Sequence, residues 1–442
     1  MIKNYLLLAL KVLRRRPFYT FISLFGISFT LMILMLITSM GDAMLGANPP
    51  MSEVDRLVFL PQIERFIEFY DTTYTVDSVL MDDGSMRYDS TVEVAAGGRN
   101  NASGNMSFPF LDQTLRGLEH VEAYTFYNNN GFVNAYLDGR KVTMSTCYTD
   151  ADYWRVFDFK FLYGVPFTAD AIEGADKVVV ITEVVAREYF GQVAQNVIGQ
   201  QINLGDDRFT VSGIVARPLK DDDAINASIF LPYTTADPRD LTGDNPAGPF
   251  DAVFKARDAR YTKNVIDQIH FIAENYDMSG DPDYEILKLY AATAIDKMAG
   301  EILLEQDYRK AKLFLFIPLG ILLTLFLALP LINLINLGVS RVYERKSEIA
   351  VRKSFGADSR DILYQFLFEN MVLTVIGGAV GCILALLLIR YINANDLVGI
   401  VRLSFSLKVF VYFLIVIALF GLLSGILPAL RMSRTNVADA LR

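Results

Sequence analysis

Four long apolar runs divide this chain into parts of membrane-spanning length and a polar remainder. They cover residues 18–37, 313–337, 371–391 and 407–430. Each run is close to the roughly 20 apolar residues that a helix needs to cross a bilayer. Between the first two runs, apolar and polar residues alternate over short segments, as they do in half-buried strands. The pattern predicts four transmembrane helices and one large folded domain inserted between helices one and two.

The inserted region predicts a mixed α/β domain. Strand candidates are 56–60, 90–95, 121–127, 132–137, 142–146, 177–182, 200–204, 209–216, 229–232, 252–255 and 284–289. Short turns rich in Asp and Gly at 138–139 and 205–207 favour two β-hairpins. Helix candidates are 109–117, 183–190 and 262–275, and Thr182 is a candidate start signal for the second. The segments 217–226 and 236–249 are predicted as loops because they are rich in Pro, Gly and Asp.

A helical pattern resumes near residue 291 and continues into the second apolar run. It predicts one unbroken helix over 296–340 that includes the second transmembrane segment. Pro318 and Pro330 lie inside this helix, and a proline inside a helix usually kinks it.

Glycines spaced four residues apart mark the third and fourth apolar runs. Gly377 and Gly381 lie in the third run, and Gly421 and Gly425 lie in the fourth. This spacing lets helix backbones approach closely, so we expect these glycines to face neighbouring helices. The alternative is that glycine is simply common in membrane helices.

The charges are distributed unevenly. The net charge is −9, but residues 41–311 carry −20 and the rest of the chain carries +11. Six basic residues lie in the short polar segment 341–370, between the second and third apolar runs: Arg341, Arg345, Lys346, Arg352, Lys353 and Arg360. A short basic loop between two spans is typical of the cytoplasmic side. We therefore expect this segment in the cytoplasm and the acidic inserted domain outside it.

That assignment gives each segment a place. The expected order is a cytoplasmic amphipathic helix (1–16), the first span (17–40), the outer domain (41–295), the long helix with the second span (296–340), the cytoplasmic segment (341–370), the third span (371–391), an outer loop (392–406), the fourth span (407–430) and a cytoplasmic tail (431–442). The alternative for the first run is a cleaved signal peptide. Its length favours a retained helix, because signal peptides have apolar regions of about 7–15 residues.

Catalytic and metal-binding patterns are missing from the sequence. It contains no GxxxxGK[ST] phosphate loop, GxSxG elbow, HExxH or CxxC motif. Two histidines and two cysteines, His120, His270, Cys147 and Cys382, exclude a His-rich metal site and a disulfide framework. We predict a chain that is not an enzyme and holds no metal and no cofactor. The carboxylates 221–223 are expected in a solvated loop rather than a calcium site, and Trp154 in the core rather than on a ligand-binding face.

The spans are almost free of ionisable residues. Transporters that carry a polar solute through their own core usually keep charged or strongly polar groups there. Only Asn333 and Asn336 interrupt the second run, near its inner end. The composition therefore argues against a channel and against a secondary carrier.

The segment 341–370 has features of a short helix, a turn and a second helix. Glu348 and Arg352 are spaced four residues apart, which favours an ion pair on a helix. Gly356 is a candidate helix terminator, and Asp358 or Ser359 is a candidate cap for the next helix. A helix here could dock a partner protein; the alternative is a charged loop that only orients the spans.

The segment ERKSEIAVRKSFGADSRDILYQFLFEN resembles the signature loop of the MacB/FtsX-type ABC transporter permeases, which include the lipoprotein-releasing permeases. The family's ERxxEIxxxRxxGA motif and the glutamate ahead of the third span are matched by Glu344, Arg345, Glu348, Ile349, Arg352, Gly356, Ala357 and Glu369. The tail PALRMSRTNVADALR resembles the family's ending. The stretch DYWRVFDFKFLYGVPF is similar to part of its periplasmic core domain.

The resemblance implies a stand-alone permease subunit of the bacterial inner membrane that lacks the ATPase domain. Its partners would be a cytoplasmic ABC ATPase, which holds ATP and magnesium, and a second permease, either a copy or a close paralogue. A periplasmic adaptor and an outer-membrane duct are compatible with this assembly, and no nucleic acid is implied. The ATPase would dock on a coupling helix formed by Glu344, Arg345, Glu348, Ile349, Arg352, Lys353, Phe355 and Gly356.

The function implied is mechanical. ATP-driven motion in the cytoplasm would pass along the long second helix to the periplasmic domain, and a substrate would be exported or released from the periplasmic side. The alternative is a signalling scaffold with the same architecture, which activates a cell-wall hydrolase or senses an antimicrobial peptide without transport.

Overall fold

A computed structural model describes residues 17–81, 85–137, 140–218, 220, 222–305, 307–344, 351, 354–355, 358–395, 397, 402–403, 405 and 407–433. Its contacts divide the chain into two compact units. We call Ala47–Pro218 together with Asp222–Lys312 the core domain. We call Met1–Gly46, Leu219–Asp221 and Leu313–Arg442 together the helical unit.

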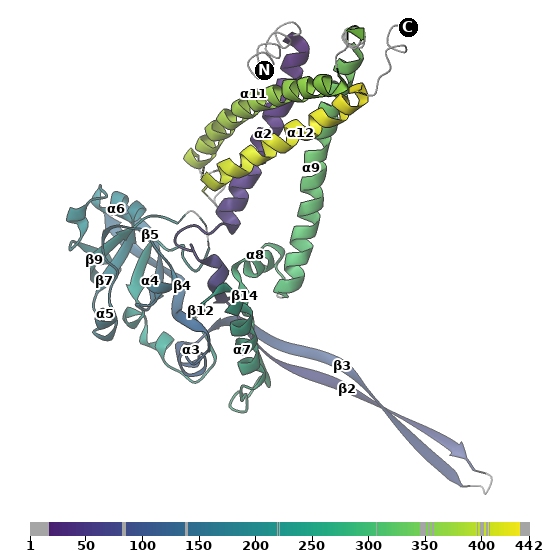
Figure 1. Cartoon of the computed structure of the whole chain (residues 1–442). Helices are drawn as coiled ribbons and strands as arrows, with labels where there is room; N and C mark the ends of the chain where they lie inside the picture. The colour runs from purple at the N-terminus through teal and green to yellow at the C-terminus, as the bar shows by residue number, and fades with distance from the viewer. Residues whose placement is uncertain are drawn as a thin grey trace. The chain divides into compact units, whose positions relative to one another are not determined.

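The core domain is built on a mixed sheet that has ten strands within the described residues (Figure 1). The strand order is β14-β1-β12-β4-β5-β10-β7-β9-β6, and β8 pairs with β9. The strands are β1 (Leu57–Leu60), β4 (Val121–Leu137), β5 (Arg140–Thr149), β6 (Phe161–Gly164), β7 (Val178–Thr182), β8 (Gln201–Leu204), β9 (Asp207–Val215), β10 (Ile229–Pro232), β12 (Asp251–Ala256) and β14 (Ala292–Thr293). Strands β7 and β9 run parallel, which requires a crossover, and helix α6 lies in that crossover.

The helices of the core domain are short. They are α3 (Phe108–Thr114), α4 (Tyr153–Val156), α5 (Ala169–Glu173), α6 (Glu183–Phe190), α7 (Thr262–Glu274) and α8 (Ala294–Leu303), with 3-10 turns at Val54–Arg56, Gln195–Val197, Tyr233–Thr235, Pro238–Leu241 and Ala259–Tyr261. Helix α6 starts where the sequence predicted, because the Thr182 hydroxyl accepts a hydrogen bond from the Val185 N–H. It ends at Gly191, whose φ of 71° is the left-handed conformation that glycine adopts without strain.

Both predicted hairpins of the main sheet are confirmed. Strands β4 and β5 pair antiparallel up to Leu137 and Arg140, on either side of the predicted turn. Strands β8 and β9 pair up to Leu204 and Asp207 around the predicted turn at 205–207. Trp154 packs in the core as expected, edge-on to several aromatic rings, among them Phe230 and Phe167.

A second sheet holds the longest strands of the chain. Its order is β11-β3-β2-β13, with β2 (Ile63–Leu80), β3 (Met86–Met106), β11 (Ala247–Gly248) and β13 (Ile286–Leu289). Strands β2 and β3 form one hairpin that extends away from the rest of the core domain (Figure 1). The predicted strand 90–95 is confirmed as part of β3, but the sequence analysis predicted neither β2 nor the rest of β3. It also missed β11, which lies in the predicted loop 236–249.

The predicted unbroken helix over 296–340 is divided in two. Helix α8 ends at Leu303, and Leu304 has a left-handed φ of 53°. The Glu305 N–H donates to the Gly300 carbonyl, which closes the end of α8. Helix α9 (Tyr308–Glu344) then begins, and the Lys310 N–H donates to the Asp307 carboxylate at 3.2 Å. A side-chain cap therefore starts the second helix where the sequence pattern suggested continuity.

The helical unit contains α2 (Pro17–Leu45), α11 (Ser359–Ala394), α12 (Leu407–Ser433) and α9 from Leu313 onward. An apolar cluster joins α2, α11 and α12, and includes Leu31, Leu373 and Phe413. The predicted amphipathic helix 1–16 lies outside the described residues, as does the predicted tail beyond Ser433.

Two helices among the described residues are long and apolar enough to cross a membrane. They cover Thr20–Leu45 and Leu367–Ala394. A shorter apolar helix covers Leu407–Leu419 within α12. The count of four transmembrane helices stays a prediction.

Candidate functional site

The predicted coupling segment is described only in part. Helix α9 ends at Glu344, and beyond it Val351, Ser354 and Phe355 are described. The Phe355 N–H donates to the Val351 carbonyl at 3.2 Å, and the Phe355 side chain is 88% exposed. This aromatic ring is accessible to a partner. The remaining predicted docking residues lie outside the described residues: Arg345, Glu348, Ile349, Arg352, Lys353 and Gly356.

Helix α11 carries a buried carboxylate about three turns after its first residue. The helix begins after Asp358, which is one of its two predicted caps. Glu369 is 9% exposed, and the Gln365 side-chain amide donates to it at 3.2 Å. A carboxylate in an apolar environment is costly unless it is hydrogen-bonded. This is the glutamate that the sequence motif places ahead of the third apolar run. Its hydrogen-bond partner, Gln365, lies on the same helix.

Two of the predicted packing glycines lie where α11 meets α2. A Cβ at Gly377 would lie 2.6 Å from Ile27 Cγ2, and a Cβ at Gly381 would lie 2.6 Å from the Ser28 carbonyl oxygen. Real Cβ atoms do not approach other atoms so closely, so a larger residue at either position would force the helices apart.

A third glycine of α11 faces α12. A Cβ at Gly378 would lie 2.5 Å from Ile417 Cδ1. The predicted glycines of the fourth run, Gly421 and Gly425, lie on α12, and their surroundings fall outside the described side chains. Helix α11 therefore approaches two neighbours through three glycines on adjacent faces.

Helix α8 is fastened to the core domain by a buried lysine that the sequence analysis did not single out. Lys297 is 3% exposed, and its Nζ lies 3.0 Å from Asp222 Oδ1 and 3.2 Å from Glu301 Oε1. Its ammonium group also lies over the Phe59 ring, 5.1 Å from the centroid. Burial acts to lower the pKa of Lys297, but Asp222 and Glu301 outweigh it and raise that pKa above its ordinary value. The lysine therefore stays charged, and without Asp222 its remaining carboxylate partner would be Glu301, whose side chain is 53% exposed.

Asp222 corrects the prediction that carboxylates 221–223 form a solvated loop. Its side chain is only 7% exposed, and its Oδ1 also accepts a hydrogen bond from the Ala224 N–H at 3.0 Å. Asp251 on β12 belongs to the same buried acidic region, and burial raises its pKa well above the ordinary value although Lys297 acts to lower it. No single-sequence signal distinguishes Asp222 from its neighbours, because its partner is 75 positions away.

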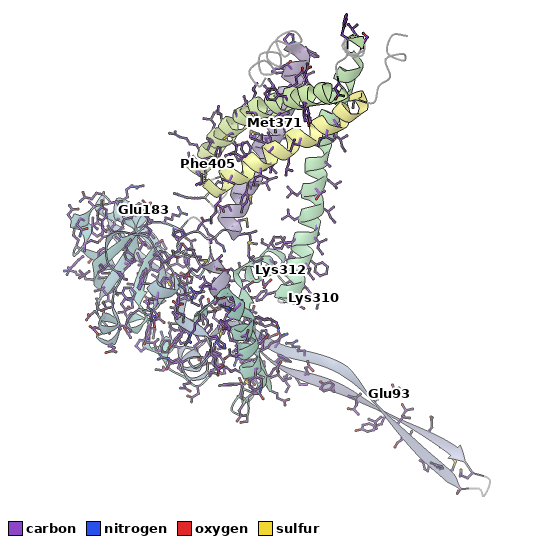
Figure 2. All side chains as sticks on the ribbon, viewed as in Figure 1. Glu93, Glu183, Lys310, Lys312, Met371 and Phe405 are labelled. Carbon is purple, nitrogen blue, oxygen red and sulfur yellow. The ribbon has the colours of Figure 1, made fainter. Side chains whose placement is uncertain are left out.

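The first turn of α9 is packed onto α8. Lys312 Nζ lies 3.0 Å from Asp296 Oδ1, and Ala311 is fully buried. A Cβ at Gly300 would overlap the Tyr308 ring, so the small residue of α8 makes room for the aromatic residue of α9. Lys310 and Lys312 mark this turn in Figure 2. Helix α8, the first turn of α9 and the core strands therefore form one packed junction.

A second buried acid joins strand β4 to helix α4. The Asp150 carboxylate accepts hydrogen bonds from the Thr125 hydroxyl at 2.8 Å, the Phe126 N–H at 3.1 Å and the Tyr153 N–H at 2.9 Å. Burial raises the pKa of Asp150 to about 7, against the effect of these three donors. Asp150 therefore titrates near neutral pH in the middle of the core domain.

A cavity of about 690 Å³ lies beside the α8–α9 junction, within the core domain. It is bordered by Lys263 and His270 of α7 on one side and by Tyr308 and Lys310 of α9 on the other. Among the described residues, no group of three or more His, Cys, Asp or Glu side chains could hold a metal ion. The cavity leaves space between α7 and the turn that links α8 to α9.

Two family profiles match the chain. The MacB-like periplasmic core domain matches residues 20–270, and the FtsX-like permease C-terminal domain matches residues 320–437. The first match covers more than half of the chain and includes most of the core domain. The second includes α11, α12 and most of α9.

Similar curated proteins are named as export ATP-binding/permease proteins. The chain is 29% identical over 296 residues to the pyoverdine export ATP-binding/permease protein PvdT of Pseudomonas fluorescens. The matched region covers 66% of this chain and 42% of that protein. It is 30% identical over 292 residues to the macrolide export ATP-binding/permease protein MacB of Bdellovibrio bacteriovorus. The matched region covers 64% of this chain and 41% of that protein. The chain therefore spans about two fifths of the length of these relatives.

Solved structures that match part of this chain include the periplasmic region of MacB from Actinobacillus actinomycetemcomitans. It has a TM-score of 0.33 and 17% identity, and the match covers 45% of this chain and 83% of that one. A domain of a permease protein from Porphyromonas gingivalis has a TM-score of 0.37 and 14% identity over 54% of this chain and 90% of that one. On the two profile matches, this chain belongs to the MacB/FtsX family of ABC transporter permeases, inner-membrane proteins with a MacB-like periplasmic core domain.

Proposed function

We propose that this chain is a non-catalytic permease subunit that transmits ATP-driven motion from the cytoplasm to its periplasmic core domain. The supporting observation is the packed junction at the start of α9. Lys297 ties α8 to Asp222 of the core domain, and Lys312 ties the first turn of α9 to Asp296 of α8. A displacement of the start of α9 would therefore be passed on to the core domain.

Helix α9 has the length that this role needs. It contains 37 residues without interruption, from Tyr308 to Glu344. At about 1.5 Å per residue it is roughly 55 Å long, which exceeds the roughly 30 Å of the bilayer's hydrocarbon core. Its last residue is also the first residue of the motif Glu344–Gly356 that we propose as the ATPase docking site. One continuous helix thus joins the two places between which motion would have to travel.

The membrane topology that fits this role has four spans with both termini in the cytoplasm. The basic segment 341–370 would lie in the cytoplasm. The core domain, which belongs to the acidic part of the chain, would lie in the periplasm. Several apolar residues of α9 are more than half exposed in the chain, including Phe314, Ile317 and Leu322. We propose that lipid and a second permease cover these side chains.

The transported substrate would be handled on the periplasmic side. Relatives named for pyoverdine export and macrolide export favour export over signalling for this chain. An ABC ATPase, with ATP and magnesium, would supply the energy, and a periplasmic adaptor with an outer-membrane duct would complete an export route.

The proposal is tested by breaking the junction while leaving both ends of α9 intact. In membranes that contain the full chain and its ATPase, Lys297→Ala should leave ATPase co-purification unchanged and abolish ATP-dependent export. Lys310→Ala is the matched control, because Lys310 is an exposed lysine of the neighbouring turn. Full export by a correctly folded Lys297→Ala variant would contradict the proposal.

A further inference from the structure

The β2–β3 hairpin contains an arm whose paired strands carry their charged residues on one face. We call residues 70–96 the arm; its two strands are paired in register from Tyr70 opposite Ala96 to Leu80 opposite Met86. A bulge between Phe69 and Tyr70 separates the arm from the root of the hairpin. Directly opposed residues in an antiparallel pair point to the same side of the ribbon, and successive residues point to opposite sides. The register therefore sorts the arm's side chains into two faces.

One face has no charge among the described side chains. It is formed by Tyr70, Thr72, Tyr74, Val76, Ser78, Met86, Tyr88, Ser90, Val92 and Val94. We call it the uncharged face. At its root it ends at Glu68, whose carboxylate accepts a hydrogen bond from the Tyr70 hydroxyl at 2.8 Å.

The opposite face carries the charges. Among the described side chains, Asp77, Arg87 and Glu93 lie on it together with threonines such as Thr75 and Thr91. Figure 2 labels Glu93 on this arm. The segment 70–96 contains six acidic residues and one basic residue, so the arm as a whole is strongly acidic. Such segregation of apolar and charged residues is the pattern of a sheet with one face buried.

The uncharged face is nevertheless open in the single chain. Tyr70 is 61% exposed, Tyr74 71% and Tyr88 68%, and the valines and Met86 are more than half exposed as well. Three tyrosines, each with roughly 150 Å² of exposed surface, and four aliphatic side chains together expose roughly 800 Å². This is about the area that one partner contributes to a standard protein interface. Patches of this size on a monomer mark an interaction surface. A two-stranded hairpin is also only marginally stable by itself in water, so covering this face would stabilise the arm.

The chemistry of the two faces indicates what covers the arm. A basic partner attracted by the negative charge would bind the face with Asp77 and Glu93, which leaves the tyrosines exposed. An anionic lipid surface would repel an arm with this charge. A second copy, in contrast, offers a face of the same shape, area and neutrality, and two arms that meet through it keep their acidic faces apart in solvent. Like-to-like contact of this kind is the isologous interface of a two-fold dimer.

We propose that the uncharged face of the arm packs against the same face of the arm of a second copy of this chain. The two ribbons form a two-layer, four-stranded structure, with the tyrosines and valines between the layers and the carboxylates outside. The pairing rests on the proposed function only in that a permease of this type works with a second permease; the contact surface is assigned from the arm itself.

The test is site-specific cross-linking in membranes that contain the full chain. Tyr74 and Val92 are opposed residues on the uncharged face, and Thr75 and Thr91 are opposed residues one position along on the other face. Single variants Tyr74→Cys and Val92→Cys should give a dimer with a short bifunctional thiol reagent, and Thr75→Cys and Thr91→Cys should give none above background. The unsubstituted chain, with its own Cys147 and Cys382, sets that background. Two differently tagged copies, expressed together, show whether the captured partner is a second copy.

A second variant keeps the test independent of one chosen position. In a Tyr88→Cys chain, adding Val92→Asp places a charge on the uncharged face and should abolish the dimer band, whereas adding Thr91→Asp should preserve it. Equal cross-linking from both faces, no cross-linking from either, or capture of a different protein or of lipid would overturn the proposal. ATPase stimulation is measured in the same membranes. If the chain stimulates ATP hydrolysis but the arms do not cross-link, only the arm contact is contradicted. If the arms cross-link but the chain does not stimulate ATP hydrolysis, only the proposed function is contradicted.

Discussion

The ammonium group of Lys297 lies 3.0 Å from the carboxylate of Asp222, although the two residues are 75 positions apart. Both side chains are almost fully buried, at 4% and 7% exposure. The pair joins helix α8 to the loop that precedes strand β10, and therefore anchors the segment that leads into α9. In the proposed function this contact is where motion enters the core domain.

Removal of one partner of this pair should destabilise the core domain strongly. Lys297→Ala removes the ammonium group that lies against the buried Asp222 carboxylate, which costs about 3–5 kcal/mol. Lys310→Ala should change the stability little, because the Lys310–Asp307 pair is exposed to solvent. Thermal and denaturant unfolding of the purified full chain measures both.

A double variant separates the charge from the packing. Asp222→Asn with Lys297→Met removes both charges and keeps the side-chain volumes, so it should restore much of the lost stability. If Lys297→Ala unfolds no more easily than Lys310→Ala, the ion pair does not contribute to stability, and other contacts must hold the junction together.

Reversal of the charges in the proposed docking helix should uncouple the ATPase. Glu348→Lys with Arg352→Glu keeps an attractive pair four residues apart on the helix, so the segment can still fold. The surface that it offers to a partner is reversed in charge. We expect normal membrane insertion and loss of the stimulation of ATP hydrolysis in reconstituted membranes. Unchanged stimulation would place the docking surface elsewhere.

A methyl group at Gly381 should disturb the packing of α11 on α2. The added Cβ would lie 2.6 Å from the Ser28 carbonyl oxygen, which belongs to the backbone and cannot rotate away. Gly381→Ala should therefore lower stability by about 1–3 kcal/mol, as overpacking does in other cores. Gly320→Ala on α9 is the matched control, since a Cβ there meets nothing within 4 Å. Equal melting temperatures for the two variants in detergent would show that α11 can shift without cost.

The stability of the core domain should fall as pH rises towards neutrality. The folded chain holds a proton on Asp150 up to about pH 7, whereas the unfolded carboxyl releases it near pH 4. The stabilisation from this proton is complete at low pH and is lost as pH rises through about 7, and it amounts to about 4 kcal/mol at most. Burial raises the pKa of Asp251 as well, so part of the slope will belong to that residue.

The contribution of Asp150 is isolated by comparing variants between pH 5 and pH 8. Asp150→Asn should be less stable overall but should show a flatter dependence on pH than the unsubstituted chain. Asp237→Asn is the control, because hydrogen bonds from Arg239 lower the pKa of Asp237 to about 2 and it does not titrate in this range. A slope that is identical in all three proteins would exclude Asp150 as the titrating group.

Local patterns in the sequence were enough for several features. The start of α6 at Thr182 and the hairpins at 138–139 and 205–207 depend on caps and turns, which involve residues close together in the chain. The family match through Glu344 and its neighbours is of the same kind, since the motif is contiguous. The arm was also within reach, because residues 70–80 and 86–94 alternate and Asp83–Gly84 lies between them. The many threonines and acids of this stretch hid the alternation from a reading based on apolar runs.

Taken alone, the sequence determined the membrane-length apolar runs, the inserted α/β domain and the family of permeases, because each of these is written in periodicity or in contiguous motifs. Only the tertiary structure decided that Asp222 is buried against Lys297, that the helix breaks at Leu304 so that Tyr308 can pack on Gly300, and that Gly381 meets Ser28. The physical reason is that burial and ion pairing depend on which distant residue occupies the neighbouring space. That choice is made by packing of the whole chain and leaves no mark on the local pattern.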